Sequence, residues 1–292
     1  MRHGKTRRSL IAALTAIVLT SGSALPAGAA DPFRSGNAAR STIGPALQSA
    51  FEDFFRNGDY LNAGQKLTKA QQQNPDEPLV YALQAALAYQ EGQVDRIVAL
   101  AQKTRQVAQA LEPRDPSRAH LYLGLAQGLE GSSIYLKDGI LGLPRVLTYV
   151  PGMFAEINQA RQLSPDDPEI NLFVGYIDVL LTKFDEALAE FRKAAPMYLS
   201  FRGQALAHRD RKDYKMALTM VDRAIEAAPR NPDLYYLKGQ ILALQGNPTA
   251  AISLFDQALE LGKQLPEGTR RQILSEKQQR LNDIAAAEAR GK

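Results

Sequence analysis

The chain has 292 residues and no cysteine, and its 35 lysines and arginines slightly outnumber its 31 aspartates and glutamates. Four of the basic residues lie within the first 30 positions, which contain no acidic residue, so the rest of the chain carries 31 charges of each sign. The lack of cysteine excludes disulfides and thiol catalysis, and the balanced charge argues against a nucleic-acid-binding protein, which needs a net basic surface.

Residues 1–30 have the pattern of a secretory signal peptide. A basic start is followed by the apolar stretch Leu10–Leu19 and by the small residues Ala27–Ala30, which suit a signal peptidase. The apolar stretch is about half of the roughly 20 residues that a membrane-spanning helix requires. We therefore expect export to the periplasm, or an equivalent extracytoplasmic compartment, and a soluble protein after cleavage. Whether the segment is cleaved stays open, as does whether "TRRSLI" at Thr6–Ile11 directs twin-arginine or general secretory export.

Residues 31–43 form a polar segment that contains Gly36 and Ser41. A segment of this composition has little apolar surface to bury, so we expect a flexible leader. The folded body then begins at residue 44.

Residues 44–265 contain a recurring turn with two prolines. It occurs as Asn74–Pro78, Glu112–Pro116, Ser164–Pro168 and Ala228–Pro232. The first proline ends one helix, a polar residue caps the next helix, and the second proline fits the first helical turn. Between these turns, apolar residues recur at helical spacing around a small polar break, which indicates a pair of helices in each unit. The acidic pairs Asp76–Glu77 and Asp166–Asp167 are interpreted as negative charge at helix N-termini rather than as a metal site.

The helix pairs resemble tetratricopeptide (TPR) repeats, in which aromatic residues, a glycine and alanines occupy fixed offsets along two helices. The last unit matches this pattern best, at Tyr235, Gly239, Leu242, Ala251, Phe255 and Ala258. The resemblance covers roughly residues 44–265 and implies an all-α, right-handed superhelix of about six helix pairs. It also implies a peptide or protein partner bound at the inner, concave wall.

Three segments further resemble an exported TPR family of photosynthetic bacteria. They are "DPFRSGN" from Asp31, "LPRVLTYVPGMF" from Leu143 and "AAPMYLSFRGQALAHRD" from Ala194. No activity is assigned to that family, so this resemblance supports export and the fold and leaves the function open.

One insertion, at about residues 131–151, departs from the repeat pattern. Its apolar residues include Ile134, Tyr135, Leu141, Leu143, Val146, Leu147 and Tyr149. Glycines and prolines interrupt it, so we expect one or two short helices that lie against the superhelix. Three roles remain open: an extra part of the core, a lid or ligand contact within the groove, or a contact with a membrane or a partner.

The C-terminal residues 266–292 alternate apolar and charged residues at helical spacing. This pattern predicts a capping helix, which shields the apolar face of the last repeat, followed by a short tail.

Residues that carry chemistry are scarce. After residue 30 the only histidines are His120 and His208, too few for a zinc site of three or four nitrogen and sulfur ligands. The sequence has no nucleophile elbow and no glycine-rich phosphate loop. We therefore predict no catalytic residue, no metal and no cofactor.

The repeat offsets that face the concave wall predict the residues that bind the partner. They are Tyr89, Leu121, Leu125, Leu172, Tyr176, Arg202, Arg209, Tyr236 and Gln240. Most of them are apolar. Two interpretations of Arg202 and Arg209 stay open: they receive a carboxylate of the partner, or they belong to a solvated face beside Asp210 and Asp213.

The predicted function is a noncatalytic protein–protein interaction or assembly scaffold of the bacterial cell envelope, which binds a peptide or a partner domain in its concave groove. The alternative is an accessory factor that docks onto a membrane complex through the apolar insertion, and hydrolysis by the protein itself ranks third. We expect no nucleic-acid partner, and the sequence does not determine the oligomeric state.

Overall fold

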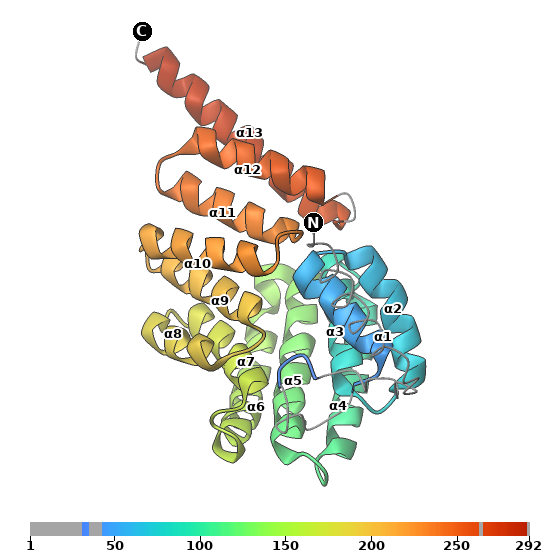
Figure 1. The fold of residues 1–292 in the computed structure, drawn as a ribbon. Helices are drawn as coiled ribbons and strands as arrows, with labels where there is room; N and C mark the ends of the chain where they lie inside the picture. The colour runs from blue at the N-terminus through green and yellow to red at the C-terminus, as the bar shows by residue number, and fades with distance from the viewer. Residues whose placement is uncertain (1–30, 35–42, 263–264, 291–292) are drawn as a thin grey trace, which may run out of the picture.

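The structure is a computed structural model that describes residues 31–34, 43–262 and 265–290. The predicted signal peptide (1–30) and most of the expected leader (35–42) lie outside these ranges. Within the described ranges every regular element is helical (Figure 1). The elements are α1 (Pro45–Phe51), the π-helical η2 (Glu52–Asn57), α2 (Tyr60–Gln73), α3 (Pro78–Gln90), α4 (Val94–Leu111), α5 (Pro116–Asp138), the 3₁₀ turn η3 (Gly139–Gly142), α6 (Leu143–Leu163), α7 (Pro168–Leu180), α8 (Phe184–Lys193), α9 (Met197–Asp210), α10 (Tyr214–Ala227), α11 (Pro232–Leu244), α12 (Pro248–Leu261) and α13 (Glu267–Arg290).

The two-proline turns begin helices as the sequence predicts. The second proline of each turn is the first residue of α3, α5, α7 or α11. The residue before that proline accepts a hydrogen bond from a backbone N–H of the first turn. These capping residues are Glu77, Asp115, Asp167 and Asn231. Each cap satisfies an N–H group for which the helix itself has no partner, so the capping interpretation of Glu77 and Asp167 is confirmed.

Successive helices pack as pairs, and the pairs stack on one another. The pairs are α1 and η2 with α2, α3 with α4, α5 with α6, α7 with α8, α9 with α10, and α11 with α12. Helix α13 packs against α12 at the end of the stack. The prediction of an all-α fold of about six helix pairs with a C-terminal capping helix is therefore confirmed.

Small residues allow the helices to approach closely, both at positions of the repeat pattern such as Ala217 and Gly239 and at Gly203, which the pattern does not single out. Ala217 is fully buried. A Cβ atom added at Gly203 would lie 2.3 Å from the ring of Phe191, and one added at Gly239 would lie 2.6 Å from the ring of Phe255. Because these contacts leave no room for a larger side chain, they set how closely neighbouring helices pack.

The insertion at 131–151 does not form short helices against the superhelix. Instead, α5 continues to Asp138 and α6 starts at Leu143, so the third pair is a long helical hairpin. The turn begins with Gly139, whose φ of 57° lies in the left-handed region that glycine adopts without strain. Gly131 and Pro151 are tolerated inside α5 and α6 because the two helices pack on each other along the hairpin.

The apolar residues of the insertion divide between the inside of this hairpin and its tip. Ile134 is buried, and the half-buried Val146 and Tyr149 face Gly131 across the hairpin. The exposed members are Tyr135, Leu141, Leu143 and Leu147. The hairpin thus contributes to the core at its base and presents apolar side chains at its tip.

The residues Asp31–Arg34, which we call the N-terminal strap, are not a flexible leader. Asp31, Phe33 and Arg34 are buried, and the ring of Phe33 packs edge-on against Phe51 with 5.1 Å between their centres. The polar composition was misleading because the charges of this segment are paired inside the protein, as described below. Polar residues can be buried when they are paired in this way.

The stack curves so far that its first and last pairs meet. The Nδ2 of Asn231, just before α11, donates a hydrogen bond of 2.8 Å to the backbone carbonyl of Phe55 in η2. The hydroxyl of Tyr60, at the start of α2, donates to the carboxylate of Asp233 on α11. Contacts between the two ends of the stack therefore border the concave side, where we expected the partner to bind.

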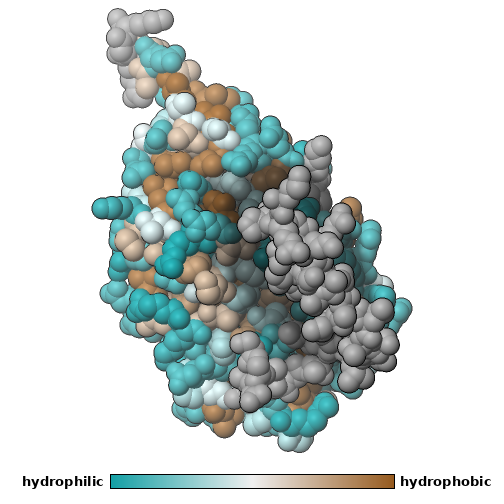
Figure 2. Space-filling model, viewed as in Figure 1, coloured by the Kyte–Doolittle hydropathy of each residue, from teal (hydrophilic) through white to brown (hydrophobic). Residues whose placement is uncertain are grey.

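The capping helix covers only part of the apolar end. Leu274 and Leu281 on α13 and Leu244 on α11 remain exposed. Figure 2 shows hydrophobic residues on the upper part of this face, where Figure 1 places α11 to α13. None of the described helices is both long enough and apolar enough to cross a membrane.

Candidate binding cavity

A cavity of about 320 Å³ lies at the concave side of the stack. Every helix pair and the N-terminal strap contribute to its lining, mostly through η2, α3, α5, α7, α9 and α11. Its apolar wall includes Phe54, Leu83, Ala86, Leu125 and Leu129. This volume lies near the lower end of the range of about 300–1,000 Å³ that is typical of small-molecule pockets.

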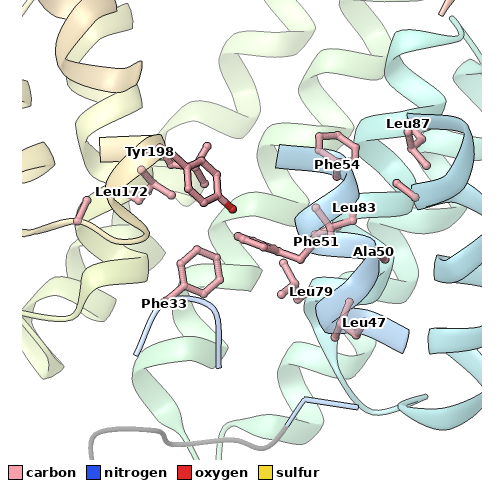
Figure 3. Packing of buried hydrophobic residues seen from close by; sticks show 14 of the residues in the cluster. Phe33, Leu47, Ala50, Phe51, Phe54, Leu79, Leu83, Leu87, Leu172 and Tyr198 are labelled. Carbon is pink, nitrogen blue, oxygen red and sulfur yellow. The ribbon is translucent and has the colours of Figure 1, made fainter. Parts of the chain in front are cut away.

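The strap closes one side of this space. Figure 3 shows Phe33 of the strap, Phe51 of α1 and Tyr198 of α9 pointing toward one another. All three are buried, and Phe33 also lines the cavity. The strap is therefore part of the wall of the cavity.

Part of the cavity lining is polar. Arg202 on α9 donates a hydrogen bond of 3.1 Å from Nη1 to the hydroxyl of Tyr176 on α7, and its guanidinium lies 5.9 Å from the centre of the Tyr176 ring. Asp233 and Tyr60, which join α11 to α2, line the same side. We call Tyr60, Tyr176, Arg202 and Asp233 the polar end of the cavity.

The protonation states of the polar end follow from burial and from these contacts. Burial raises the pKa of Asp233, although the hydrogen bond from Tyr60 and the charge of Arg202 oppose this effect. Burial and the nearby Asp233 charge raise the pKa of Tyr60 well above its usual value, so this hydroxyl keeps its proton and acts as a donor. Interaction with Tyr176 and then with Asp233 raises the pKa of Arg202 despite its burial, so the guanidinium stays charged.

Four of the predicted partner-binding residues come together at this cavity, namely Leu125, Leu172, Tyr176 and Arg202. Leu121, on the same helix as Leu125, is buried in the core at 1% exposed. Tyr89 lies at the end of α3, exposed and away from the cavity lining.

The remaining predicted residues, Arg209, Tyr236 and Gln240, already contact other side chains of the protein. The Tyr236 hydroxyl donates a hydrogen bond of 2.5 Å to Glu276 on α13, and the Gln240 amide donates to the same carboxylate at 3.2 Å. Arg209 donates to Gln240 and to Asp210. Offsets within a repeat predict which way a side chain points. They do not predict that another segment of the chain will contact it.

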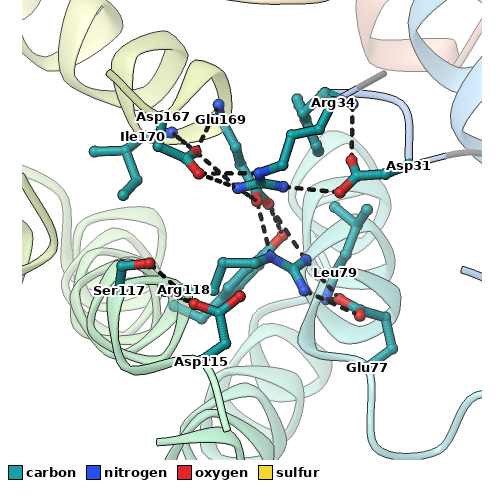
Figure 4. A network of polar contacts seen from close by, with 12 residues as sticks. Asp31, Arg34, Glu77, Leu79, Asp115, Ser117, Arg118, Asp167, Glu169 and Ile170 are labelled. Carbon is teal, nitrogen blue, oxygen red and sulfur yellow. Dashed lines mark hydrogen bonds and ion pairs between the residues drawn. The ribbon is translucent and has the colours of Figure 1, made fainter. Parts of the chain in front are cut away.

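A second polar cluster, which the sequence analysis missed, lies where the strap meets α3, α5 and α7 (Figure 4). Arg34 pairs with Asp167 at 2.7 Å and with Glu169 at 2.9 Å. Arg118 pairs with Glu169 at 2.8 Å and with Glu77 at 2.9 Å. We call these five residues the buried ion cluster.

Glu169 is the centre of this cluster. It is fully buried and also accepts a hydrogen bond of 2.5 Å from the hydroxyl of Tyr122. Burial alone would raise the pKa of Glu169, but Arg118 and Arg34 outweigh that effect and lower the pKa to about 2. The sequence carried one weak signal for the cluster: Arg118 and Glu169 both follow a turn proline within two residues. This places each charge at the start of a helix but does not indicate that the two charges meet.

Neither His120 nor His208 is among the residues that line the cavity. Nδ1 of His120 is 2.6 Å from the carboxylate of Glu156, and burial followed by the charge of Arg211 lowers the pKa of His208. Among the described residues, no group of three or more histidine, cysteine, aspartate or glutamate side chains is placed to hold a metal ion. The cavity offers apolar contact, hydrogen bonds and one positive charge.

Residues 202–266 match the family model described as tetratricopeptide repeat. The matched region runs from within α9 to just beyond α12, which covers most of the fifth pair and the whole sixth pair. No curated protein matches the chain in sequence.

Several solved structures have a similar helical arrangement. A tetratricopeptide repeat protein from Parabacteroides merdae ATCC 43184 is 19% identical over 85% of this chain and 94% of its own, with a TM-score of 0.43. Yeast Tom70 is 13% identical over 88% of this chain and 68% of its own, with a TM-score of 0.42. YrrB, a TPR protein with an unusual peptide-binding site, is 17% identical over 68% of this chain and 93% of its own, with a TM-score of 0.35. These similarities concern the helical repeat and do not extend to a function.

Proposed function

We propose that this protein is a noncatalytic binding module of the bacterial cell envelope, which holds an exposed segment of a partner protein at its concave side. The observation that supports this function most strongly is the cavity to which all six helix pairs contribute. A surface that is shared by every repeat is the one that a helical repeat protein offers to a partner.

The size of the cavity restricts the kind of partner. About 320 Å³ accommodates a few side chains but no folded domain. The partner therefore inserts a short extended or protruding segment, whose apolar side chains contact the wall formed by Leu83, Ala86 and Leu125. Export to the envelope is supported by the signal-peptide pattern of residues 1–30.

A cavity-filling substitution tests this function. Ala86 lies on α3 in the cavity wall, so Ala86→Phe should fill the space. Ala110, exposed on the neighbouring α4, provides the matched control Ala110→Phe. Both variants must fold as judged by circular dichroism. In a crosslinking pull-down from envelope extract, we expect the original protein and Ala110→Phe to capture the same partner and Ala86→Phe to lose it. Equal capture by all three proteins would place the binding surface elsewhere.

The tip of the α5–α6 hairpin supports a second candidate function, docking onto a membrane complex. Ile140 and Leu141 at the tip are 74% and 86% exposed, and Tyr135 and Leu147 next to them are also exposed. Monomeric proteins rarely leave a group of large apolar side chains in contact with water, so such a tip fits a contact with a further component of the envelope.

The double substitution Ile140→Ser/Leu141→Ser tests this second function. Leu180, which is 83% exposed at the end of α7, provides the control Leu180→Ser. If the tip docks, sedimentation with envelope membranes falls in the double variant and persists in the control. Unchanged sedimentation of the double variant would rule out docking through the tip.

A further inference from the structure

We propose that the chemical group recognised by the cavity is a carboxylate on an apolar chain, and that a small amphipathic carboxylate binds there with its charge at Arg202 and its chain against the apolar wall. This inference rests on the proposed function, because it requires the cavity to be accessible. It goes further by assigning a ligand class and the residue that selects it.

The pairing of Arg202 differs from that of the other arginines that face the interior. Arg34 pairs with the three carboxylates of Asp31, Asp167 and Glu169. Arg118 pairs with two carboxylates. Arg202 is also charged and half-buried, yet within the described part of the chain only the neutral hydroxyl of Tyr176 accepts a hydrogen bond from it, and no carboxylate forms an ion pair with it.

A charge held away from water is stabilised when an opposite charge pairs with it. An arginine presents five N–H groups in a planar fork that matches a carboxylate. Because Tyr176 uses one of the five, the remaining N–H groups of Arg202 can bind a carboxylate that enters the cavity.

Asp233 does not take this role. Its carboxylate accepts the hydrogen bond from Tyr60 that joins the two ends of the stack, and it makes no ion pair with Arg202. Asp233 contributes negative charge on the same side of the cavity, and this charge opposes the binding of an anion. The substitution of Asp233 therefore gives a prediction opposite in sign to that of Arg202.

The rest of the lining defines the body of the ligand. Arg202 is the only cationic side chain among the described residues that line the cavity, so the site suits one negative charge rather than a polyanion. The other walls are formed by apolar side chains such as Phe54, Leu125 and Leu129. A monoanion with a hydrocarbon body meets both conditions.

Decanoate is the probe for this site. Its binding to the protein that starts at Asp31 is measured by isothermal titration calorimetry. Decan-1-ol and decyltrimethylammonium, which have the same hydrocarbon chain with a neutral or a positive head group, are measured for comparison. We expect decanoate to bind at least about 10-fold more tightly than the alcohol, since hydrogen bonds to a charged group are among the stronger ones. The cation should not bind.

Three substitutions assign the head group to Arg202. Arg202→Gln should weaken decanoate binding at least about 10-fold and leave that of decan-1-ol unchanged, because only the charged pair is lost. Arg202→Lys should restore part of the affinity, since it keeps the charge and loses the planar fork. Asp233→Asn should leave decanoate binding equal or tighter, because the amide can still accept the hydrogen bond from Tyr60. Circular dichroism and melting temperature establish that each variant is folded.

Chain length tests the apolar wall. From hexanoate to decanoate, each added methylene should tighten binding about fourfold, until the cavity is full. Ala86→Phe, which fills the cavity, should shift that limit to a shorter chain.

Equal binding of decanoate and decan-1-ol, or full affinity in Arg202→Gln, would overturn the assignment of a carboxylate to Arg202. The absence of any detectable decanoate binding would also overturn this assignment. If one of these results is found while partner capture still depends on Ala86, the proposed function stands and only the ligand class is wrong. If decanoate binds and partner capture does not depend on Ala86, the ligand class stands and the protein-binding function is wrong.

Discussion

Arg34 and Asp167 lie 133 residues apart in the sequence and are joined by a two-pronged ion pair inside the protein. Nε of the arginine donates to Oδ2 at 2.9 Å, and Nη2 donates to Oδ1 at 2.7 Å. The same carboxylate caps α7 by accepting the backbone N–H groups of Glu169 and Ile170. The contact therefore attaches the N-terminal strap to the start of the fourth helix pair, and the strap is part of the folded structure.

Replacing Arg34 should destabilise the protein strongly. Arg34→Met leaves Asp31 and Asp167 buried without their main counter-charge, and breaking a buried pair in this way costs about 3–5 kcal/mol of unfolding free energy. Arg145 pairs with Asp138 in an exposed position at the hairpin tip, so Arg145→Met should cost no more than about 1 kcal/mol. Urea unfolding followed by circular dichroism measures both variants. Similar losses in the two would show that the buried pair does not hold the strap in place.

The stability of the protein should fall in acid, with Glu169 as one cause. The pKa of this carboxyl is lowered from 4.5 to about 2 in the folded protein, so its contribution to stability is complete above pH 4.5 and is lost as the pH falls toward 2. Glu169→Gln removes this titration. The slope of unfolding free energy against pH measures the number of protons taken up on unfolding. Between pH 4.5 and 2 this slope should be smaller for the variant, by the equivalent of up to one proton. Parallel slopes for the two proteins would contradict the lowered pKa.

Enlarging a buried alanine at a helix contact should destabilise the stack. Ala217 and Ala251 are fully buried, so Ala217→Leu or Ala251→Leu overpacks the contact and should cost about 1–3 kcal/mol. Ala110→Leu on the exposed face of α4 is the control. Thermal unfolding should show a lower midpoint for the two buried variants only. A midpoint that matches the original protein would contradict the close contact at that alanine.

Two glycines inside helices should respond in opposite ways to alanine. An added Cβ at Gly203 would lie 2.3 Å from the Phe191 ring, so Gly203→Ala should destabilise by about 1–3 kcal/mol. At Gly128 in α5 the nearest side-chain atom, Sδ of Met153, is 3.4 Å away. Gly128→Ala should therefore be neutral or stabilise by up to about 1 kcal/mol, because alanine favours a helix. Denaturant midpoints that shift in the same direction for both would show that the Phe191 contact can relax.

Local signals in the sequence predicted the repeating part of the fold well. Pro78, Pro116, Pro168 and Pro232 begin helices as expected, and the buried alanines lie where the repeat pattern places them. These features depend on neighbours within a few residues, such as the N–H groups that Asp167 caps, so they can be recognised without knowledge of the fold.

The insertion shows where such reasoning fails. Its glycines and prolines favour breaks, but Gly131 and Pro151 lie inside long helices, because α5 and α6 stabilise each other by packing. The binding residues show a related limit. The predicted Tyr176 and Arg202 do line the cavity, while Tyr236 and Gln240 are engaged by Glu276 of the capping helix.

By itself, the sequence determined the helices outside the insertion and their pairing, because spacing and capping are properties of adjacent residues. Only the tertiary structure decided that the strap is buried, that Asn231 meets Phe55, and that a cavity with Arg202 at one side results. The physical reason is curvature. Small differences in packing at each helix contact add up along the stack, and their sum determines which distant residues meet.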